Sequence, residues 1–420
     1  MTIYRSDRET GGLTRRDVVK GGVAAASLGL AAPAYLRHAR AQEGPIKIGF
    51  PVPLSGPYST EAQDQVRCAE IAISMFNEAG GLNGRMAELV VRDDKLDPGE
   101  AATRALELIE SDKVHFLCGS LSASVQLSVN QVASQRGVIY NSISQSDSIN
   151  EAADFTKYTF HEALNPHMTA GAVGRHVFKS GDRVAFLLAD YAYGHEMLRG
   201  FRRVGEEIGI EEVAEVRHPL GTTDFSTFFP TIQAAAPDVF VCINFGRDQL
   251  NTLKQAYDFG IQQQTQIAYP VLLMTQRLAG GPGPFEGVIG AANYYWGIER
   301  DHPSAKRLND AYRARHGNAV PSDYGALGFA GVYGLLEGVK KAGSVDADAV
   351  IAAMEGMTYD AYKGNQTFRA CDHQSMQSVL VVQSKPQSEM ENEMDIFDVV
   401  ATQPAEEQFL RSCEELGLKT

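Results

Sequence analysis

Hydroxyl-bearing loops follow the predicted strands of this chain, and their chemistry suits a ligand with a negatively charged group. Parallel sheets bind ligands at the carboxyl ends of their strands, where loops from several strands meet. Serine hydroxyls and the free backbone N–H groups at a helix start together favour an anion such as a carboxylate. One such loop alone is more typical of a helix cap or a turn. Here polar loops follow predicted strands in five segments, at 54–59, 119–124, 142–146, 190–194 and 244–247.

Catalytic and cofactor motifs are absent from the sequence. It contains no GxSxG nucleophile elbow, no phosphate-binding Walker loop and no HExxH zinc motif. Gly49 and Gly56 follow the first predicted strand, but two prolines lie between them and the dinucleotide fingerprint is not formed. The ten histidines are scattered along the chain, as surface or buried polar residues usually are. We therefore expect a protein that is not an enzyme and that carries no cofactor or metal.

The elements that must position these loops follow an α/β pattern. Short apolar runs alternate with longer amphipathic segments, which is typical of βαβ units and a parallel sheet. The first series predicts strands at 46–52, 87–92, 114–118 and 138–141, with helices at 62–77, 97–109 and 122–135. The second predicts strands at 184–188, 213–217 and 239–243, with helices at 168–178, 197–208, 225–236 and 248–259. Two such series indicate two similar lobes.

The chain after residue 287 contains too few predicted strands for a third domain. We expect it to return to the first lobe with helices at 304–316, 325–342 and 347–354. The helix at 325–342 is rich in small residues, which indicates close packing. The last predicted strands, at 366–369 and 379–383, are expected to join the second lobe.

The N-terminal segment has the features of an export signal that is removed from the mature protein. Arg15 and Arg16 precede an apolar run at 23–36 that is too short and alanine-rich to span a bilayer reliably. The small-x-small pattern that a signal peptidase cuts ends at Ala41. The segment resembles a twin-arginine signal, although a basic helix start is the alternative. We expect residues 1–41 to be removed near Ala41 and the protein to work in the periplasm.

Composition describes a globular protein whose partner is not a nucleic acid. The chain has 420 residues, of which 44% are hydrophobic and 21% charged, and a net charge of -14. That negative charge argues against nucleic acid or an anionic membrane surface. Five cysteines leave at least one unpaired; Cys118 and Cys242 lie in apolar runs and are expected to be buried thiols. Cys371 and Cys413 form a disulfide or stay reduced, and the sequence leaves both open.

Four motifs together give the chain a family resemblance. They are IKIGFPVPLSGPYS at 46–59, FNEAGGLNGR at 76–85, VVRDDKLDPGEAATRALELIESDKVHFLCGSLSAS at 90–124 and DYAYG at 190–194. From residue 42 onward the chain resembles the periplasmic binding proteins of branched-chain amino acid type ABC transporters, the Leu/Ile/Val-binding family. The resemblance implies a type I periplasmic binding fold, in which two doubly wound α/β lobes are joined by three crossing segments near Ala163, Ala291 and Asn365. It places the N-terminal lobe at 42–163 and 292–364, and the C-terminal lobe at 164–291 and 365–420.

The resemblance also implies a ligand site between the lobes. The matching positions are Ser59, Thr60, Ser122, Ala123, Ser124, Ser144, Ser146, Tyr193, Phe245 and Val271. Ala123 stands where the amino-acid binders have a serine, and Val271 stands where they place an acidic residue that neutralises the ligand's ammonium. An unpaired buried ammonium costs several kcal/mol, so an apolar side chain at Val271 selects against α-amino acids. We expect a carboxylate ligand without an amino group, such as an aromatic or other hydrophobic acid.

Within this resemblance, the expected partners are the small-molecule ligand and an ABC permease in the inner membrane, and the expected protein is a monomer. A branched-chain or other amino acid or amide binder of the same family is one alternative. An exported enzyme is another, with mild support from the twin-arginine pattern. A ligand-sensing domain for a membrane partner is a third. We further expect Tyr193→Ala to weaken ligand affinity without unfolding the protein, because a cleft aromatic contacts ligand rather than core.

Overall fold

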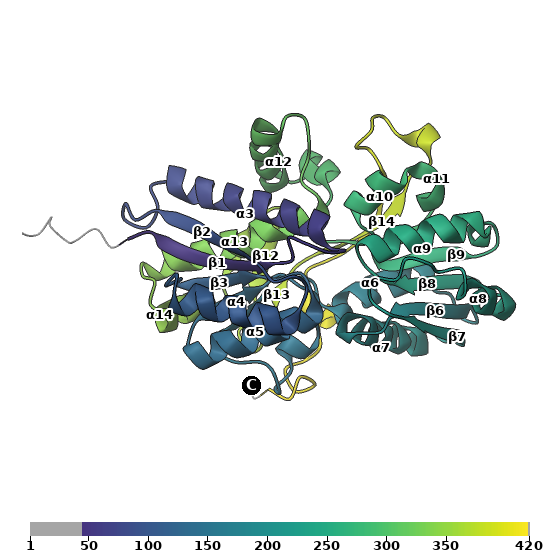
Figure 1. The fold of residues 1–420 in the computed structure, drawn as a ribbon, viewed down its shortest axis with the longest axis horizontal. Coiled ribbons are helices and arrows are strands. Elements are labelled where there is room, and N and C mark those ends of the chain that lie inside the picture. Colours follow the sequence, from purple (N-terminus) through teal and green to yellow (C-terminus); the bar gives the residue numbers. More distant parts are fainter. Residues whose placement is uncertain (1–43, 419–420) are drawn as a thin grey trace, which may run out of the picture. The chain divides into compact units, whose positions relative to one another are not determined.

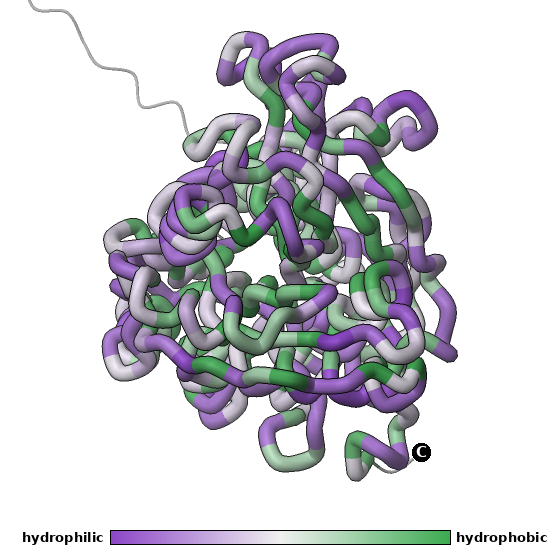
Figure 2. Tube along the Cα trace, turned by 90° about the vertical axis from the view of Figure 1, so that its right-hand side faces the viewer, coloured by the Kyte–Doolittle hydropathy of each residue, from purple (hydrophilic) through white to green (hydrophobic). Residues whose placement is uncertain are grey.

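The computed structural model describes residues 44–418, so the predicted export signal at 1–41 lies outside the described residues. Residues from Ile46 onward form one compact unit that contains two large sheets and their helices (Figure 1). We call the five-stranded sheet and its helices the first lobe, and the seven-stranded sheet and its helices the second lobe. Hydrophobic stretches run through the interior of this unit, and many hydrophilic stretches lie in its outer loops (Figure 2).

The first lobe is built on a fully parallel sheet with strand order β2-β1-β3-β4-β5. Its strands are β1 (Ile46–Val52), β2 (Ala87–Asp93), β3 (Phe116–Gly119), β4 (Ile139–Ser142) and β5 (Thr159–His161). Its helices are α3 (Ser59–Glu78), α4 (Pro98–Glu110), α5 (Ala123–Arg136), α12 (Pro303–His316), α13 (Asp323–Ala342) and α14 (Ala347–Met354). After the second series the chain packs its three late helices here: α12 and α13 contact α3, and α14 contacts α13.

The second lobe has strand order β15-β14-β10-β9-β8-β6-β7. Its strands are β6 (Arg183–Ala189), β7 (Glu211–His218), β8 (Val239–Ile243), β9 (Gln266–Val271), β10 (Ile289–Ala292), β14 (Val379–Ser384) and β15 (Phe397–Gln403). Its helices are α6 (Pro166–Val177), α7 (Ala192–Ile208), α8 (Phe229–Ala235), α9 (Arg247–Asp258), α10 (Met274–Gly280) and α11 (Pro282–Phe285). The strands from β7 to β10 are parallel, whereas β14 and β15 are antiparallel to their neighbours.

Helices α3 and α13 pack against each other at very short range because α13 carries glycines on that face. A Cβ atom on Gly328 would lie 2.4 Å from the carbonyl oxygen of Gln65, which no side chain tolerates. At the start of α13, Ser322 accepts a hydrogen bond from the N–H of Gly325, so its hydroxyl caps the helix. The carboxylate of Asp64 in α3 accepts bonds from the N–H and hydroxyl of Ser322, which ties the two helices together.

The chain passes between the lobes three times, and the third passage lies later than expected. The first follows β5 near Ala163 and the second follows β10. The strand predicted at 366–369 does not join the second lobe. It forms β12 (Asn365–Phe368), which pairs with β11 (Thr358–Asp360) and β13 (Ser375–Met376) in a small antiparallel sheet.

Packing explains why β12 stays with the first lobe. The ring of Phe368 meets Phe160 of β5 edge to face, with 5.3 Å between ring centroids, and it stacks on Tyr359. The crossing predicted near Asn365 is therefore wrong, because the passage to β14 occurs at Gln377 and Ser378. The strand predicted at 379–383 does join the second lobe as β14.

A buried lysine connects two of the three passages. The Nζ of Lys363 donates hydrogen bonds to the carbonyl oxygens of Asn293, just after β10, and of Ser378, just before β14, both at 2.8 Å. Burial lowers the pKa of Lys363 to about 7, and the nearby charge of Glu162, in the first passage, raises it in turn. Residues from all three crossing segments thus lie around one buried polar group.

The only tryptophan in the sequence lies beside the second passage. Trp296 follows β10, and its Nε1 donates a hydrogen bond of 2.8 Å to the carbonyl oxygen of Met394, in the connection between β14 and β15. The hydroxyl of Tyr295 donates to the same carbonyl at 3.2 Å. The segment that leaves the second sheet is therefore attached to a loop of that sheet by two aromatic side chains.

Cys371 and Cys413 form a disulfide in the structure, a question that the sequence had not decided. Cys68, Cys118 and Cys242 are free and buried, which confirms the prediction of buried thiols for Cys118 and Cys242. The disulfide holds the C-terminal segment against the loop that precedes β13.

Removing this disulfide is expected to lower the free energy of unfolding by about 4 kcal/mol. Its two cysteines are 42 residues apart, and opening a loop of that length adds conformational entropy to the unfolded chain. Urea unfolding of Cys413→Ser measures the loss. A reductant is expected to bring the wild-type midpoint to that of Cys413→Ser and to leave the variant unchanged; an unshifted variant midpoint would contradict the expectation.

Candidate functional site

The predicted serine loops of the first lobe meet at neighbouring strand ends. Strands β3 and β4 pair so that Gly119 lies beside Ser142, which places the loop at 119–124 next to the loop at 142–146. The hydroxyl of Tyr140 donates a 2.7 Å hydrogen bond to the Gly119 carbonyl and accepts a 3.1 Å bond from the Ser120 N–H. One buried tyrosine therefore holds the end of β3 against β4.

The hydroxyl positions in these two loops differ in exposure. Ser122, Ser144 and Ser146 are buried, Ser124 is half-buried, and Ala123 begins α5 with its side chain buried. The backbone carbonyl of Ser144 lies 2.7 Å from Nε2 of His161, which fixes the loop after β4. Burial lowers the pKa of His161 to about 4, so the imidazole is neutral at physiological pH.

The first loop presents a tyrosine to the lobe boundary. Ser59 is half-buried and Thr60 is exposed in the first turn of α3, and neither side chain meets the other predicted site residues through a recorded contact. Tyr58, which precedes them, is only 1% exposed, and its hydroxyl shares a 3.0 Å hydrogen bond with that of Tyr191 in the second lobe. The sequence analysis predicted that this loop contributes to the ligand site, but it did not include Tyr58 among the site residues.

A cluster of aromatic rings from both lobes forms the centre of the candidate site. Phe245 of the second lobe lies edge to face against Tyr58 and against Tyr324, with ring centroids 4.8 Å apart in each pair. The ring centroids of Tyr193 and Phe245 are 6.4 Å apart, so the structure brings these two predicted second-lobe residues together. Edge-to-face pairs of this kind are a preferred arrangement of aromatic rings and stabilise the contact beyond the apolar area that they bury. We call Tyr58, Tyr193, Phe245 and Tyr324 the aromatic cluster.

A glycine allows the second-lobe loop to approach this cluster. Gly246 has φ +57, a backbone conformation that side chains rarely adopt, and a Cβ there would lie 2.7 Å from the ring of Tyr58. The next N–H, of Arg247, donates to the carbonyl oxygen of Pro57 at 3.3 Å. Because first-lobe and second-lobe residues are in direct contact here, the structure shows a closed arrangement of the two lobes.

The hydroxyl of Tyr193 is buried and has no hydrogen-bond partner among residues 44–418. Tyr193 is 4% exposed and belongs to the hydrophobic core of the second lobe, together with Met197 and Phe201. Burial raises the pKa of its phenol well above the ordinary value, so the group is a neutral donor. A buried donor of this kind loses free energy unless something accepts its proton.

Val271, the predicted apolar substitution, ends β9 and is 1% exposed. Its side chain belongs to the same hydrophobic cluster as Tyr58 and Phe245. Its carbonyl oxygen accepts a 2.8 Å hydrogen bond from Nε2 of Gln249. The position therefore offers no charge toward the lobe boundary.

Two carboxyl groups at the boundary were not found by sequence reasoning. Glu61 of α3 accepts hydrogen bonds from Thr275 and, at 2.6 Å, from Nε2 of Gln276, both in α10 of the second lobe. Asp323 begins α13 and is 1% exposed. Burial, followed by the charge of Glu61, raises the pKa of Asp323 to about 8. Neither carboxyl group follows a strand, so the loop pattern gave no signal for them.

Closure is expected to weaken as the pH rises from 5.5 to 8. Burial raises the pKa of three carboxyl groups at the lobe boundary, those of Glu61, Asp323 and Asp147. The pKa of Asp147 reaches about 7, because the charge of Glu196 raises it further while the charges of Arg199 and Arg411 lower it. A carboxyl group whose pKa is raised in the closed form favours closure while protonated and opposes it once ionised. Small-angle X-ray scattering of the ligand-free protein should therefore give a larger radius of gyration at pH 8. An unchanged radius would contradict this expectation, and Asp147→Asn should reduce the pH effect.

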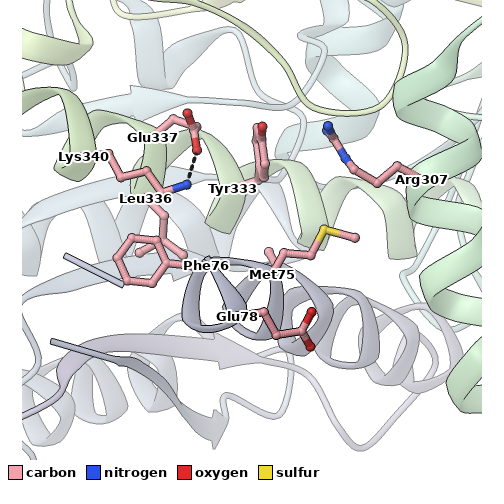
Figure 3. Close-up of a pocket in the computed structure, with 9 residues that line it drawn as sticks. Met75, Phe76, Glu78, Arg307, Tyr333, Leu336, Glu337 and Lys340 are labelled. Atoms are coloured by element: carbon pink, nitrogen blue, oxygen red, sulfur yellow. Dashed lines mark hydrogen bonds and ion pairs between the residues drawn. The ribbon is translucent and has the colours of Figure 1, made fainter. Parts of the chain in front are cut away.

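A hollow in the first lobe is lined by residues other than those of the aromatic cluster. It has a volume of about 380 Å³ between α3, α12 and α13, with Met75, Phe76 and Leu336 along its apolar part (Figure 3). Lys340 donates a 2.8 Å hydrogen bond to Glu337 at its edge. None of the predicted site residues lines this hollow, so it is not part of the candidate site.

Comparisons with known proteins agree with this geometry. The profile of a family described as periplasmic binding protein matches residues 45–389. The chain belongs to the periplasmic binding protein family. A curated relative, a Leu/Ile/Val-binding protein homolog 7 of Brucella abortus, is 26% identical over 337 residues, covering 76% of this chain and 82% of the relative.

Two solved structures show the same fold. A periplasmic binding protein from Burkholderia mallei is 29% identical, with a TM-score of 0.82 over 88% of this chain and 97% of that one. A solute-binding protein of an ABC transporter from Rhodopseudomonas palustris, solved with 3,4-dihydroxybenzoic acid, is 22% identical, with a TM-score of 0.77 over 86% and 98%. These matches confirm the predicted type I periplasmic binding fold of two α/β lobes.

Residues 44–418 contain no group of three or more His, Cys, Asp and Glu side chains placed to hold a metal ion. Within the same residues, every helix is too short or too polar to cross a bilayer.

Proposed function

We propose that this protein binds a small hydrophobic or aromatic carboxylate between its lobes and delivers it to an ABC permease in the inner membrane. It works in the periplasm as a monomer after its export signal is cut near Ala41. The aromatic cluster is the observation that carries the proposal. Rings from both lobes meet there, and Ala123 of one serine loop belongs to the same hydrophobic cluster as Tyr193. One ligand with an apolar body and an anionic end can therefore contact both lobes.

The chemistry of the serine loops supports the carboxylate end of the ligand. Ser122 and Ala123 stand at the start of α5, where unpaired N–H groups and the positive end of the helix dipole favour an anion. Ser144 brings a buried hydroxyl from the adjacent strand end, and the Ser146 hydroxyl beside it donates to Glu196. Ser59, Thr60 and Ser124 are the remaining polar positions of the proposed site. Tyr193 adds a neutral donor whose hydroxyl is available. Val271 contributes an apolar position instead of a counter-charge.

Known members of the fold accept ligands of this class. The Rhodopseudomonas palustris protein was solved with 3,4-dihydroxybenzoic acid, an aromatic carboxylate. That likeness shows only that the type I fold can hold such a molecule. The assignment for this chain rests on its own aromatic cluster and on the uncharged Val271.

An α-amino acid is the second candidate, because Glu61 and Asp323 supply carboxyl groups at the lobe boundary. Glu61 Oε2 is buried without a hydrogen-bond partner among residues 44–418. The carboxyl group of Asp323 is buried as well, with the backbone N–H groups of Tyr324 and Met274 beside it. An ammonium group is the natural partner for such oxygens. The Brucella abortus relative carries a Leu/Ile/Val-binding name, which also favours this candidate.

Calorimetric titration with benzoate, 3,4-dihydroxybenzoate and leucine distinguishes the two candidates. The proposal predicts heat of binding for the aromatic acids and none for leucine. Tight leucine binding would overturn it in favour of the second candidate. Chromatography of each mixture after incubation tests the exported-enzyme alternative, since a binding protein returns its ligand unchanged.

A further inference from the structure

One carboxylate of the second lobe holds three consecutive residues of a first-lobe ligand loop. Glu196 accepts hydrogen bonds from the Ser146 hydroxyl at 3.2 Å, the Asp147 N–H at 2.7 Å and the Ser148 hydroxyl at 2.6 Å. Glu196 is 5% exposed, so these bonds are made out of water. Bonds to a buried charged acceptor are stronger than bonds between neutral groups.

The position of Glu196 in α7 links it to the aromatic cluster. It lies three residues after Tyr193, so both side chains project from the same face of the first turns of this helix. Tyr193 reaches Phe245, while Glu196 reaches the loop that follows β4. A rigid helix therefore presents one group to the rings and one to the serine loop.

The neighbouring charges strengthen the contact between the lobes but do not replace it. Arg199, one turn further along α7, lies 3.8 Å from carboxylate oxygens of both Asp147 and Glu151 in the first lobe. Its side chain is 57% exposed, so these ion pairs contribute little in water. All the recorded hydrogen bonds of the Glu196 carboxylate run to first-lobe groups, and each is lost when the lobes separate.

We propose that Glu196 is a positioning residue that couples lobe closure to the conformation of residues 146–148 in the loop that follows β4. When the lobes meet, its carboxylate accepts the hydroxyl protons of Ser146 and Ser148 and the N–H of Asp147. The loop is then held in one conformation, with the hydroxyl of Ser144 as the donor that it keeps for the ligand. The same bonds favour the closed form even before ligand arrives. The ligand part of this inference rests on the proposed function, whereas the closure part does not.

Hydrogen–deuterium exchange of the ligand-free protein tests the closure part. The variant Glu196→Gln keeps the size of the side chain but loses its charge, and Glu206→Gln, on the exposed side of α7, is the matched control. The Asp147 amide should exchange at least roughly 10-fold faster in Glu196→Gln and at the wild-type rate in Glu206→Gln. Unchanged exchange at Asp147 would overturn the proposal, as would faster exchange spread evenly over both lobes.

Titration of ligand into the Glu196→Gln variant shows whether Glu196 couples lobe closure to ligand binding or has only a structural role. The acid that binds wild type in the panel above should bind Glu196→Gln about 10-fold more weakly, with the loss mainly in a faster dissociation rate. Equal affinity together with faster exchange would overturn the coupling and leave Glu196 a structural residue. If wild type binds neither the aromatic acids nor leucine, the proposed function fails on its own, and the exchange result still decides whether Glu196 holds the lobes together.

Discussion

Tyr193→Phe is expected to weaken binding of the aromatic acid by roughly 10- to 100-fold while leaving the protein as stable as wild type. The hydroxyl of Tyr193 is buried without a partner in the described part of the chain, so removing it breaks no hydrogen bond there. A bond from that hydroxyl to a carboxylate is worth about 1.5–3 kcal/mol, which gives this range of affinity. Calorimetric titration and thermal unfolding of the variant measure the two quantities.

The matched control removes a hydroxyl that already has a partner within the protein. Tyr140→Phe breaks the bonds that hold Gly119 and Ser120, so it should lower stability, unlike Tyr193→Phe. Unchanged affinity in Tyr193→Phe would remove its hydroxyl from the ligand site. The alanine variant expected from sequence is less informative, because Tyr193 packs in the second-lobe core and its loss would also create a cavity.

Lys363→Met is expected to lower the free energy of unfolding by about 3–5 kcal/mol. The substitution leaves the carbonyls of Asn293 and Ser378 without their donor and removes the cation beside Glu162. Breaking a buried polar arrangement by removing one partner has a cost of this size. Chemical denaturation at pH 6, where the lysine is mostly charged, measures it.

Lys340→Met provides the comparison for Lys363→Met. Lys340 is an exposed lysine of α13, and its replacement should change the unfolding free energy by less than about 0.5 kcal/mol. Similar losses in the two variants would show that the hydrogen bonds of Lys363 are not important for stability. Burial raises the pKa of Glu162 to about 7, so this carboxyl group is mostly ionised only at higher pH. At pH 8, adding Glu162→Gln to Lys363→Met should restore part of the loss if the charge of Glu162 is what the lysine offsets.

Local sequence signals were sufficient for elements whose ends are set by nearby residues. Asp97 followed by Pro98 predicted the start of α4, and the structure shows the Asp97 carboxylate accepting from the N–H of Glu100 at 2.7 Å. The strand at Val239–Ile243 and the helix at Ala347–Met354 have the predicted bounds. Each carries its own apolar pattern and needs no distant partner to be defined.

The elements that were placed wrongly or missed depend on distant contacts. The strand β12 looks like any short strand in the sequence, and only the packing of Phe368 on Phe160 assigns it to the first lobe. The strand β15 has mostly exposed or half-exposed side chains, so its residues show little of the apolar alternation that marks a half-buried strand.

The residues of the candidate site also fall into those that nearby sequence predicted and those that depend on distant contacts. Serine loops after strands, together with Tyr193 and Phe245, followed from strand ends and from the family resemblance. Tyr58 and Tyr324 join them only because the two lobes bring α3 and α13 against the loop of Phe245. Glu196 had no signal at all, since its role depends on hydrogen bonds to residues 48–50 positions away in the chain.

The attachment of Trp296 to Met394 gives this protein an intrinsic optical reporter. Because the chain has a single tryptophan, its emission comes from one place beside the crossing segments. The carbonyl oxygen of Trp296 accepts a hydrogen bond from Asn309 of α12 in the first lobe, while its indole bonds a loop of the second lobe. A swing of one lobe against the other is therefore expected to change the surroundings of that indole without any label being added. Stopped-flow fluorescence can thus follow opening and closing in real time in the unmodified protein.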